Sequence, residues 1–257
     1  MKFTGERYMP DIFNEKEYIS QMHLRRYEFA LLFANDKTVI DIACGEGYGA
    51  DKLAETASKV TGIDIENKTI EHAKNKYKKN NLSFIVGSVD KIEMPNESID
   101  LIISFETIEH VKLQSQKMFL QEVIRVLKPN GYFIVSTPEK DIYGEGNNEF
   151  HLREMNKPGF LKLLKPYFIS IELYGQDIKK YGNPIFLFIK RILHKLIKFD
   201  KFKIRHKLFP KKFRLKIDNS LFVTEGNQFN NISNDLMPMK ISEKETAMFL
   251  VAVCQKK

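Results

Sequence analysis

The sequence predicts an α/β protein with a seven-stranded, mainly parallel sheet and helices on both faces. The first observation behind this prediction is that short apolar runs alternate with segments of helical periodicity. The second is a turn with glycines at alternate positions (Gly45, Gly47 and Gly49), which follows the first apolar run directly. The third is a carboxylate, Asp64, that ends the second run, where such sheets bind ribose hydroxyls.

The composition is that of a globular protein. The 257 residues, 43% of them hydrophobic, suffice for one large domain or one domain with an appendage. The two cysteines, Cys44 and Cys254, have neither disulfide nor metal-ligand spacing, which favours a reducing compartment. The N-terminus lacks an apolar signal core, and no run approaches the roughly 18 apolar residues of a membrane span. We therefore expect a soluble, cytoplasmic protein.

Positive charge is concentrated in one segment. The net charge is +8, but residues 186–216 alone carry 12 Lys and Arg against one Asp, so the rest of the chain is slightly acidic. Residues 185–198 have the pattern of a basic amphipathic helix. Such a helix either lies on an anionic membrane surface or packs on a domain with its lysines in solvent. Residues 185–216 are thus a candidate peripheral membrane or subunit contact, and the protein could lie at the inner face of the membrane.

The chain begins with a segment that precedes the first strand. Residues 1–37 include an expected helix over 17–34, in which Tyr27, Ala30 and Ala34 share one apolar face with Leu31. This helix could pack as a lid over the cofactor end of the sheet.

The glycine turn lies within residues 38–49, which predict a buried strand, a tight turn and a helix start. Glycine has no Cβ, so it adopts positive φ and lets a ligand approach the backbone closely. The spacing is G-x-G-x-G rather than the G-x-G-x-x-G of dinucleotide sites, and Asp41 precedes the first glycine by four residues. A carboxylate there would repel a pyrophosphate and attract a cationic ligand. The spacing thus argues against an NAD-dependent oxidoreductase, the first alternative class.

The remaining strands are predicted from short apolar runs, and the remaining helices from apolar residues at helical spacing. Polar loops after the fourth and fifth strands are candidates for ligand contact, because ligands bind at the carboxyl ends of parallel strands. We expect a main domain over 38–175 and 244–257, with an insertion at 176–243. Further strands are expected at 59–65, 83–87, 99–105, 132–136, 169–174 and 247–253, and helices at 48–57, 68–79, 115–127 and 157–164.

The stretch from Asp41 to Gly49 resembles the first motif of the class I S-adenosylmethionine-dependent methyltransferases, D-x-x-x-G-x-G-x-G. The resemblance implies a Rossmann-like three-layer α/β/α sandwich with an antiparallel last strand, and S-adenosylmethionine as cofactor. It implies that the glycine turn contacts the methionine and ribose parts of the cofactor and that Asp64 holds the ribose hydroxyls. The cofactor-binding residues expected on this basis are Asp41, Ala43, Gly45, Glu46, Gly47, Asp64, Ile65, Ser88, Val89, Asp90, Phe105 and Arg26.

The adenine contact departs from the family pattern. The family commonly has an acid directly after the glycine that ends the third strand, where this chain has Ser88. Asp90 follows two residues later, so the contact falls either to Asp90 or to Ser88 and the Val89 backbone.

Four short segments also resemble a subgroup of bacterial methyltransferases (methyltransferase type 11 like) associated with surface-polysaccharide assembly. They are Thr4 to Pro10, His23 to Phe29, the ETIEH sequence after the fourth strand, and NEFHLRE, in which Glu149 replaces a proline. In the second segment, Arg26 could pair with the cofactor carboxylate, although a solvated helix position is an equal alternative. The subgroup favours a sugar, a nucleotide sugar or a capsule precursor as methyl acceptor.

Histidines in two of these segments are the candidates for chemistry. A sugar hydroxyl is a weak nucleophile that benefits from a general base. His110 is the first choice for that base and His151 the second, whereas Glu109 could orient His110. Adjacent strand residues face opposite ways, which argues against the last pairing. Glu106 is a further candidate for chemistry or for binding the methionine end of the cofactor, and Arg153 and Glu154 are of second rank. No clear cluster of metal ligands is evident.

Other acceptors and roles stay open. A phosphate-type or carboxylate oxygen would need no base, and the basic insertion keeps RNA as a minor alternative. The chain lacks the N/D-P-P-Y/F motif of enzymes that methylate exocyclic base amines, so nucleic acid is the less favoured partner. A non-catalytic partner protein that keeps the cofactor fold is the remaining class.

Overall fold

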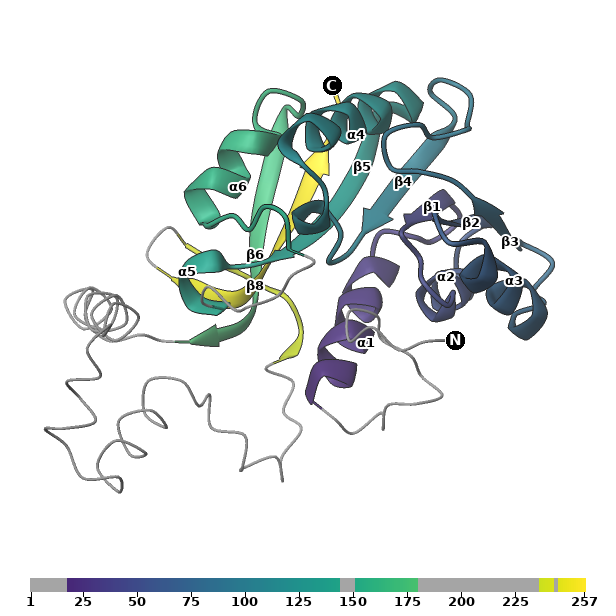
Figure 1. Cartoon of the computed structure of the whole chain (residues 1–257), viewed down its shortest axis with the longest axis horizontal. Coiled ribbons are helices and arrows are strands. Elements are labelled where there is room, and N and C mark those ends of the chain that lie inside the picture. Colours follow the sequence, from purple (N-terminus) through teal and green to yellow (C-terminus); the bar gives the residue numbers. More distant parts are fainter. Residues whose placement is uncertain (1–17, 144–150, 180–235, 243–244) are drawn as a thin grey trace, which may run out of the picture. The chain divides into compact units, whose positions relative to one another are not determined.

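The structure is a computed structural model that describes residues 18–143, 151–179, 236–242 and 245–257 (Figure 1). The chain divides into two compact units, residues 1–179 with 234–257 and residues 180–233. All features below belong to the first unit. The expected basic helix over 185–198 and the proposed contact segment 185–216 lie outside the described residues.

One mixed sheet forms the middle layer of this unit. Its eight strands run in the order β3-β2-β1-β4-β5-β8-β6-β7. Neighbours from β3 to β5 pair in parallel, whereas β8 is antiparallel to both β5 and β6. The strands are β1 Thr38–Ile42, β2 Lys59–Asp64, β3 Leu82–Val86, β4 Ile99–Ser104, β5 Leu127–Pro138, β6 Ser170–Lys179, β7 Met239–Lys240 and β8 Thr246–Gln255.

Helices connect the strands and cover both faces of the sheet (Figure 1). The helices are α1 Tyr18–Leu31, α2 Tyr48–Leu53, α3 Asn67–Lys76, the 3₁₀ helix η1 Ile108–His110, α4 Leu113–Val126, α5 Lys140–Tyr143 and α6 Lys157–Leu164. None of the helices within the described ranges is long and apolar enough to cross a membrane.

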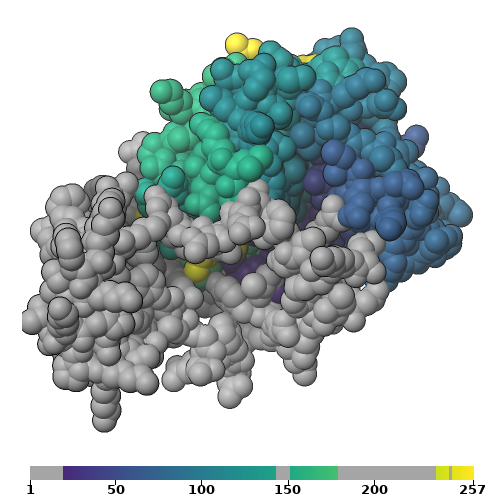
Figure 2. All heavy atoms as spheres, viewed as in Figure 1, coloured from purple at the N-terminus to yellow at the C-terminus, as the bar shows by residue number. Residues whose placement is uncertain are grey.

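Strand alternation gives the two faces separate cores. Ile40 and Ile42 of β1 point into a core that includes Phe119 of α4 and Phe160 of α6. Val39, which precedes Ile40 and so faces the opposite way, points into a second core that includes residues of α1, α2 and α3. The teal and green segments that include α4 and α6 form part of the visible surface in the space-filling view (Figure 2). The result is the expected three-layer α/β/α sandwich.

The predicted architecture is confirmed, with differences at its edges. The sheet has eight strands rather than seven, because the two-residue β7 pairs with β6 at the sheet edge. The fifth strand is longer than expected and reaches Pro138, because its last residues pair with β8. The sixth strand continues to Lys179, beyond the predicted start of the insertion at residue 176. The helix over 17–34 is described from Tyr18 and packs within the same unit.

The strand order creates a switch point between β1 and β4. From β1 the chain moves outward to β2 and β3 on one side, and it then returns to β4 and β5 on the other. The loops after β1 and β4 therefore diverge at the carboxyl edge of the sheet, which is where open α/β sheets bind ligands. The glycine turn and η1 are these two loops.

Candidate cofactor and acceptor site

The glycine turn follows β1 with three residues in the left-handed region. Ala43 has φ 59°, Gly45 has φ 54° and Gly47 has φ 86°. A Cβ on Gly47 would lie 2.6 Å from the Phe84 ring, so only glycine fits this position without rearrangement. Among the residues that the structure describes, no atom outside the immediate neighbours lies within 4 Å of a Cβ built on Gly45, so none of them covers the backbone there. This turn can receive a ligand against its main chain.

Asp64 ends β2 directly beside the turn. Its Oδ2 accepts a hydrogen bond from the Gly45 backbone N–H at 3.0 Å, and its Oδ1 accepts one from Glu66 N–H at 2.9 Å. Each carboxylate oxygen has a second lone pair, so the same group can accept hydroxyl protons of a ligand. The two backbone donors fix the orientation of the buried carboxylate before any ligand binds.

An exposed apolar side chain lies next to this carboxylate. Ile65 is 72% exposed, which is unusual for isoleucine in a packed domain and suits a flat apolar ligand group. The loop after β3 carries the half-buried Ser88, Val89 and Asp90, and the Ser88 hydroxyl donates to Asp90 Oδ1 at 2.5 Å. The structure thus ties the two candidate adenine contacts to each other.

Helix α1 packs onto the glycine turn through Tyr27. The Tyr27 hydroxyl lies 3.2 and 3.1 Å from the two carboxylate oxygens of Asp41, which is completely buried. The Tyr27 ring occupies the position of a Cβ at Gly49, only 2.0 Å away, and it contacts Tyr48 and Phe105 edge-on. The helix therefore packs directly against the glycine turn, and its role as a lid stays a prediction.

Burial changes the charge behaviour of this contact. Desolvation raises the pKa of Asp41 to about 8, although the Tyr27 hydrogen bond opposes the shift and the nearby Asp64 adds to it. The pKa of Tyr27 is raised as well, chiefly by burial and then by Asp41. Asp41 is therefore neutral over part of the physiological range unless a cation approaches it.

Two other predicted cofactor residues are buried beside the turn. Glu46 is 2% exposed, and its Oε2 lies 3.8 Å from His72 Nε2. Phe105, at the end of β4, is 8% exposed and packs against Tyr27.

Arg26 lies in a buried polar network at the ends of β4, β5 and β6. One guanidinium nitrogen donates to Gln176 Oε1 at 3.1 Å and lies 3.4 Å from Glu106 Oε1. Glu106 in turn accepts from the Ser136 hydroxyl at 2.5 Å. The interpretation of Arg26 as a solvated helix residue is wrong, since the side chain is 1% exposed. Its pairing with the cofactor carboxylate stays a prediction.

Glu109 is the most buried of the predicted catalytic residues. One of its oxygens accepts from the Thr137 hydroxyl at 3.1 Å, and the other has no hydrogen-bond partner in the part of the chain described. Burial, followed by the neighbouring Glu106, raises the pKa of Glu109 well above its usual range. Glu109 and His110 lie on η1 and not on a strand, so the expectation that they face opposite ways fails.

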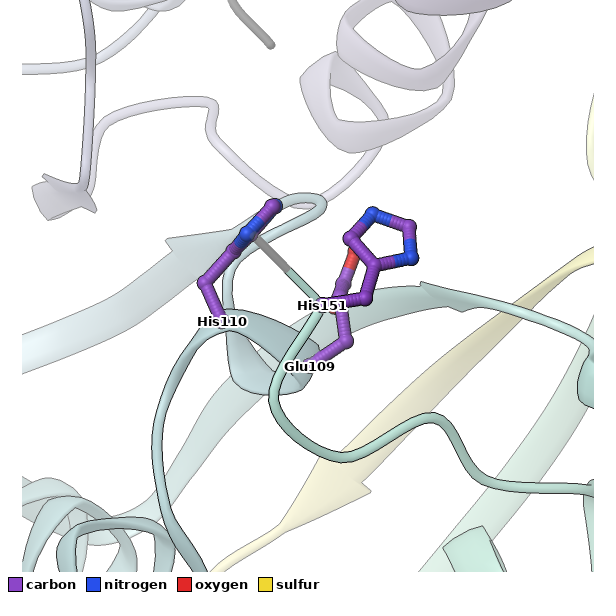
Figure 3. A group of neighbouring side chains, drawn as sticks. All are labelled: Glu109, His110 and His151. Carbon is purple, nitrogen blue, oxygen red and sulfur yellow. The ribbon is translucent and has the colours of Figure 1, made fainter. Parts of the chain in front are cut away.

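The two predicted histidines meet at the same place. The ring centroids of His110 and His151 are 4.8 Å apart, with the rings nearly perpendicular. Figure 3 shows Glu109 and His110 on one turn and His151 on a separate segment beside it. His151 Nδ1 is 2.8 Å from Glu154 Oε1, which fixes the ring orientation. Glu109, His110 and His151 each offer one atom that could ligate a metal ion, and these atoms lie within 4.8 Å of one another.

Two side chains hold the segments together. The Arg153 backbone N–H donates to the Glu109 carbonyl at 2.9 Å, and the Arg153 guanidinium hydrogen-bonds Gln116. Gln116 is fully buried and donates to the Ile108 carbonyl at 2.7 Å. These contacts align the segment that carries His151 with η1.

Comparisons with known proteins agree with this geometry. Residues 40–135 match the family model described as a methyltransferase domain. A probable S-adenosylmethionine-dependent methyltransferase of Mycolicibacterium smegmatis is 33% identical over 176 residues, which cover 67% of this chain and 66% of the relative. One of Mycobacterium tuberculosis is 32% identical over 180 residues, which cover 68% of this chain and 64% of that relative.

Residues 40–135 thus belong to the methyltransferase domain family that this model describes. S-adenosylmethionine is the cofactor that this family uses. The chain spans slightly less than two thirds of the length of these curated relatives. A crystal structure from Thermotoga maritima, titled a methyltransferase and possible histamine N-methyltransferase, has a TM-score of 0.58. At 14% identity, covering 95% of this chain and 98% of that one, it shows the shared methyltransferase fold.

Sequence reasoning missed several polar side chains of the site. Tyr27 was interpreted as part of an apolar helix face, although its hydroxyl reaches Asp41. Its place next to Arg26 in the HLRRYEF segment was the available signal. Gln116 and Gln176 carry no signal in the sequence, because an isolated glutamine is ordinary on any surface.

Proposed function

We propose that this methyltransferase transfers a methyl group from S-adenosylmethionine to a hydroxyl oxygen of a sugar, a nucleotide sugar or a small surface-polysaccharide precursor. The observation that carries the proposal is that Asp64, the glycine turn and the His110–His151 pair share the carboxyl edge of the sheet. A nucleoside site and a candidate base thus flank one switch point. The sugar acceptor rests on the resemblance of the ETIEH and NEFHLRE segments.

The cofactor half of the proposal rests on the turn. Backbone groups from Ala43 to Gly47 would hold the methionine and ribose parts, and Asp64 would accept the ribose hydroxyls. Exposed Ile65 would cover one face of the adenine, with Ser88, Val89 and Asp90 at its edge. When bound, the cofactor supplies a methyl group carried on a positively charged sulfur. Once the methyl group has been transferred, the rest of the cofactor is released as a neutral thioether.

The acceptor half of the proposal rests on the histidines. His110 would take the proton of the acceptor hydroxyl as the oxygen attacks, and His151, oriented by Glu154, is the alternative base. Alignment of the nucleophile would account for most of the rate, because the sulfonium is already a good leaving group.

Calorimetric titration with S-adenosylmethionine and S-adenosylhomocysteine tests the cofactor half. We expect micromolar binding that Asp64→Ala weakens by at least about tenfold, since the ribose hydroxyls lose their acceptor. Glu71→Ala, which removes an exposed carboxylate on α3, is the matched control and should bind as wild type does. Absence of binding by folded protein would refute the proposal.

A screen with methyl-labelled cofactor tests the acceptor half. Label should pass to a hydroxyl of nucleotide sugars or glycan precursors, located by mass spectrometry. Transfer only to carboxylates or phosphates, or only to RNA, would replace the sugar acceptor. Cofactor binding without transfer to any acceptor would favour a partner role.

A further inference from the structure

Three side chains at the acceptor end have the composition of a metal-binding set. Glu109, His110 and His151 each offer one ligand atom, and these three atoms lie within 4.8 Å of one another. Two imidazoles and one carboxylate form a set that binds divalent zinc and other first-row transition metals. The side chains come from η1 and from a segment distant in sequence (Figure 3), so the tertiary fold brings them together.

The distances suit a site that closes on its ion. Bonds of about 2.0–2.2 Å from metal to nitrogen or oxygen place ligand atoms about 3–4 Å apart. The ligand atoms would therefore move together by roughly 1 Å, which side-chain rotation can supply. The Gln116 and Arg153 contacts already hold the two backbone segments in place.

Two of the ligands have the outer partners that metal sites use. The Thr137 hydroxyl donates to one Glu109 oxygen, while the other oxygen is buried and has no hydrogen-bond partner within the described residues. His151 Nδ1 lies 2.8 Å from the Glu154 carboxylate. A carboxylate behind a ligating histidine raises the basicity of the ring and fixes its orientation.

The local charge also favours a further cation. Glu109 is fully buried, and the one positive charge that acts on it, that of Arg26, already lies 3.4 Å from Glu106. Glu106 also accepts a hydrogen bond from the Ser136 hydroxyl. Two neighbouring carboxylates thus share one guanidinium, and a divalent ion would supply additional counter-charge.

We propose that Glu109, His110 and His151 bind a divalent first-row transition-metal ion. Three protein ligands leave coordination positions open, one of which could take the acceptor oxygen and lower the pKa of its hydroxyl. In the metal-loaded protein this ion takes the place of His110 as activator, because a ligating nitrogen cannot also accept a proton. The role in methyl transfer rests on the proposed function, whereas the binding itself does not.

Zinc titration of the full chain, after treatment with a chelator, tests the binding. We expect one zinc ion per chain at this site with micromolar or tighter affinity, weakened at least tenfold by Glu109→Gln and by His151→Gln. Glu154→Gln removes only an outer partner and should cost about 10–100-fold. Glu93→Gln, an exposed carboxylate, is the matched control and should leave binding unchanged. Cobalt(II) should give a visible absorption band that Glu109→Gln abolishes.

Two results would overturn the inference: no zinc binding, or zinc binding that Glu109→Gln and His151→Gln leave intact. Neither result bears on the proposed function, because cofactor binding and methyl transfer are measured in separate experiments on chelator-treated protein. Failure of cofactor binding would in turn leave the zinc titration unaffected. Circular dichroism of each variant shows whether it is folded, and Glu109→Gln keeps the shape of the buried side chain.

Discussion

The proposed cofactor end and the proposed acceptor end of this site are built in different ways. The cofactor end comes from one short stretch, in which β1, the glycine turn and the start of α2 follow one another, joined by Asp64 of the next strand. The acceptor end joins η1, the end of β5 and the segment of His151, with Arg26 and Gln176 beside them. A contiguous site depends on local backbone conformation, whereas an assembled one depends on buried polar contacts between distant segments.

The largest effect is expected at the acceptor end. His110→Ala should lower turnover by about 10²–10⁴-fold if the acceptor is a neutral hydroxyl, because activation of the nucleophile is lost. Affinity for S-adenosylmethionine should stay as in wild type, which steady-state kinetics and calorimetry together would show. Lys112→Ala, an exposed neighbour, serves as the control. A change of only a few fold would instead indicate an acceptor that is already an anion.

Gly49→Ala tests whether the glycine turn depends on its contact with α1. The new Cβ would lie 2.0 Å from the Tyr27 ring, which Tyr48 and Phe105 hold in place. We expect a loss of stability of about 3 kcal/mol, the upper part of the range for overpacking, measured by urea unfolding. Gly159→Ala in α6 should change stability by less than about 1 kcal/mol. Equal effects of the two substitutions would show that α1 does not constrain the turn.

Gln176→Ala removes the amide that links α1 to β6. Its amide nitrogen donates to the Met22 and Leu236 carbonyls at 2.8 and 2.7 Å, and its oxygen accepts from Arg26. Leaving these buried groups without partners should cost about 1–3 kcal/mol in the free energy of unfolding. Gln114→Ala, an exposed glutamine on α4, should have almost no effect. Indistinguishable urea midpoints for the two variants would contradict the network.

The smallest effect concerns Asp41 and pH. Its pKa is about 8 in the folded protein and near 4 when unfolded, so its protonation stabilises the fold. This stabilisation is complete below about pH 4 and is lost as the pH rises through 8. Asp41→Asn stays neutral, so between pH 5 and 8 it should gain at least about 1.4 kcal/mol relative to wild type in urea unfolding.

The matched control for Asp41 is Asp36→Asn, because Asp36 is exposed and lies just before the same strand. Taken through the same urea series, Asp36→Asn measures the effect of removing an exposed carboxylate near this strand. If the free energy of unfolding of Asp41→Asn changes with pH in the same way as that of wild type, the Asp41 carboxyl is not buried under Tyr27 as the structure shows it.

The same contrast explains what could be predicted from the sequence. The glycine turn and its strand were predictable because positive φ and apolar runs are properties of neighbouring residues. His110 and His151 were candidates singly, but their 4.8 Å separation depends on Gln116 and Arg153, which no periodicity marks. A two-residue strand such as β7 carries too few residues for alternation to show.

The pairing of β6 with β7 at the edge of the sheet bears on which insertions and replacements this chain can tolerate. β6 and β7 pair through Tyr174 with Lys240 and Gly175 with Met239. The described chain is interrupted after Lys179 of β6 and resumes just before β7, which pairs with β6 at the sheet edge, away from the switch point between β1 and β4. Segments of different length or character could be exchanged between these two points while the strands that carry the glycine turn and the histidines keep their register.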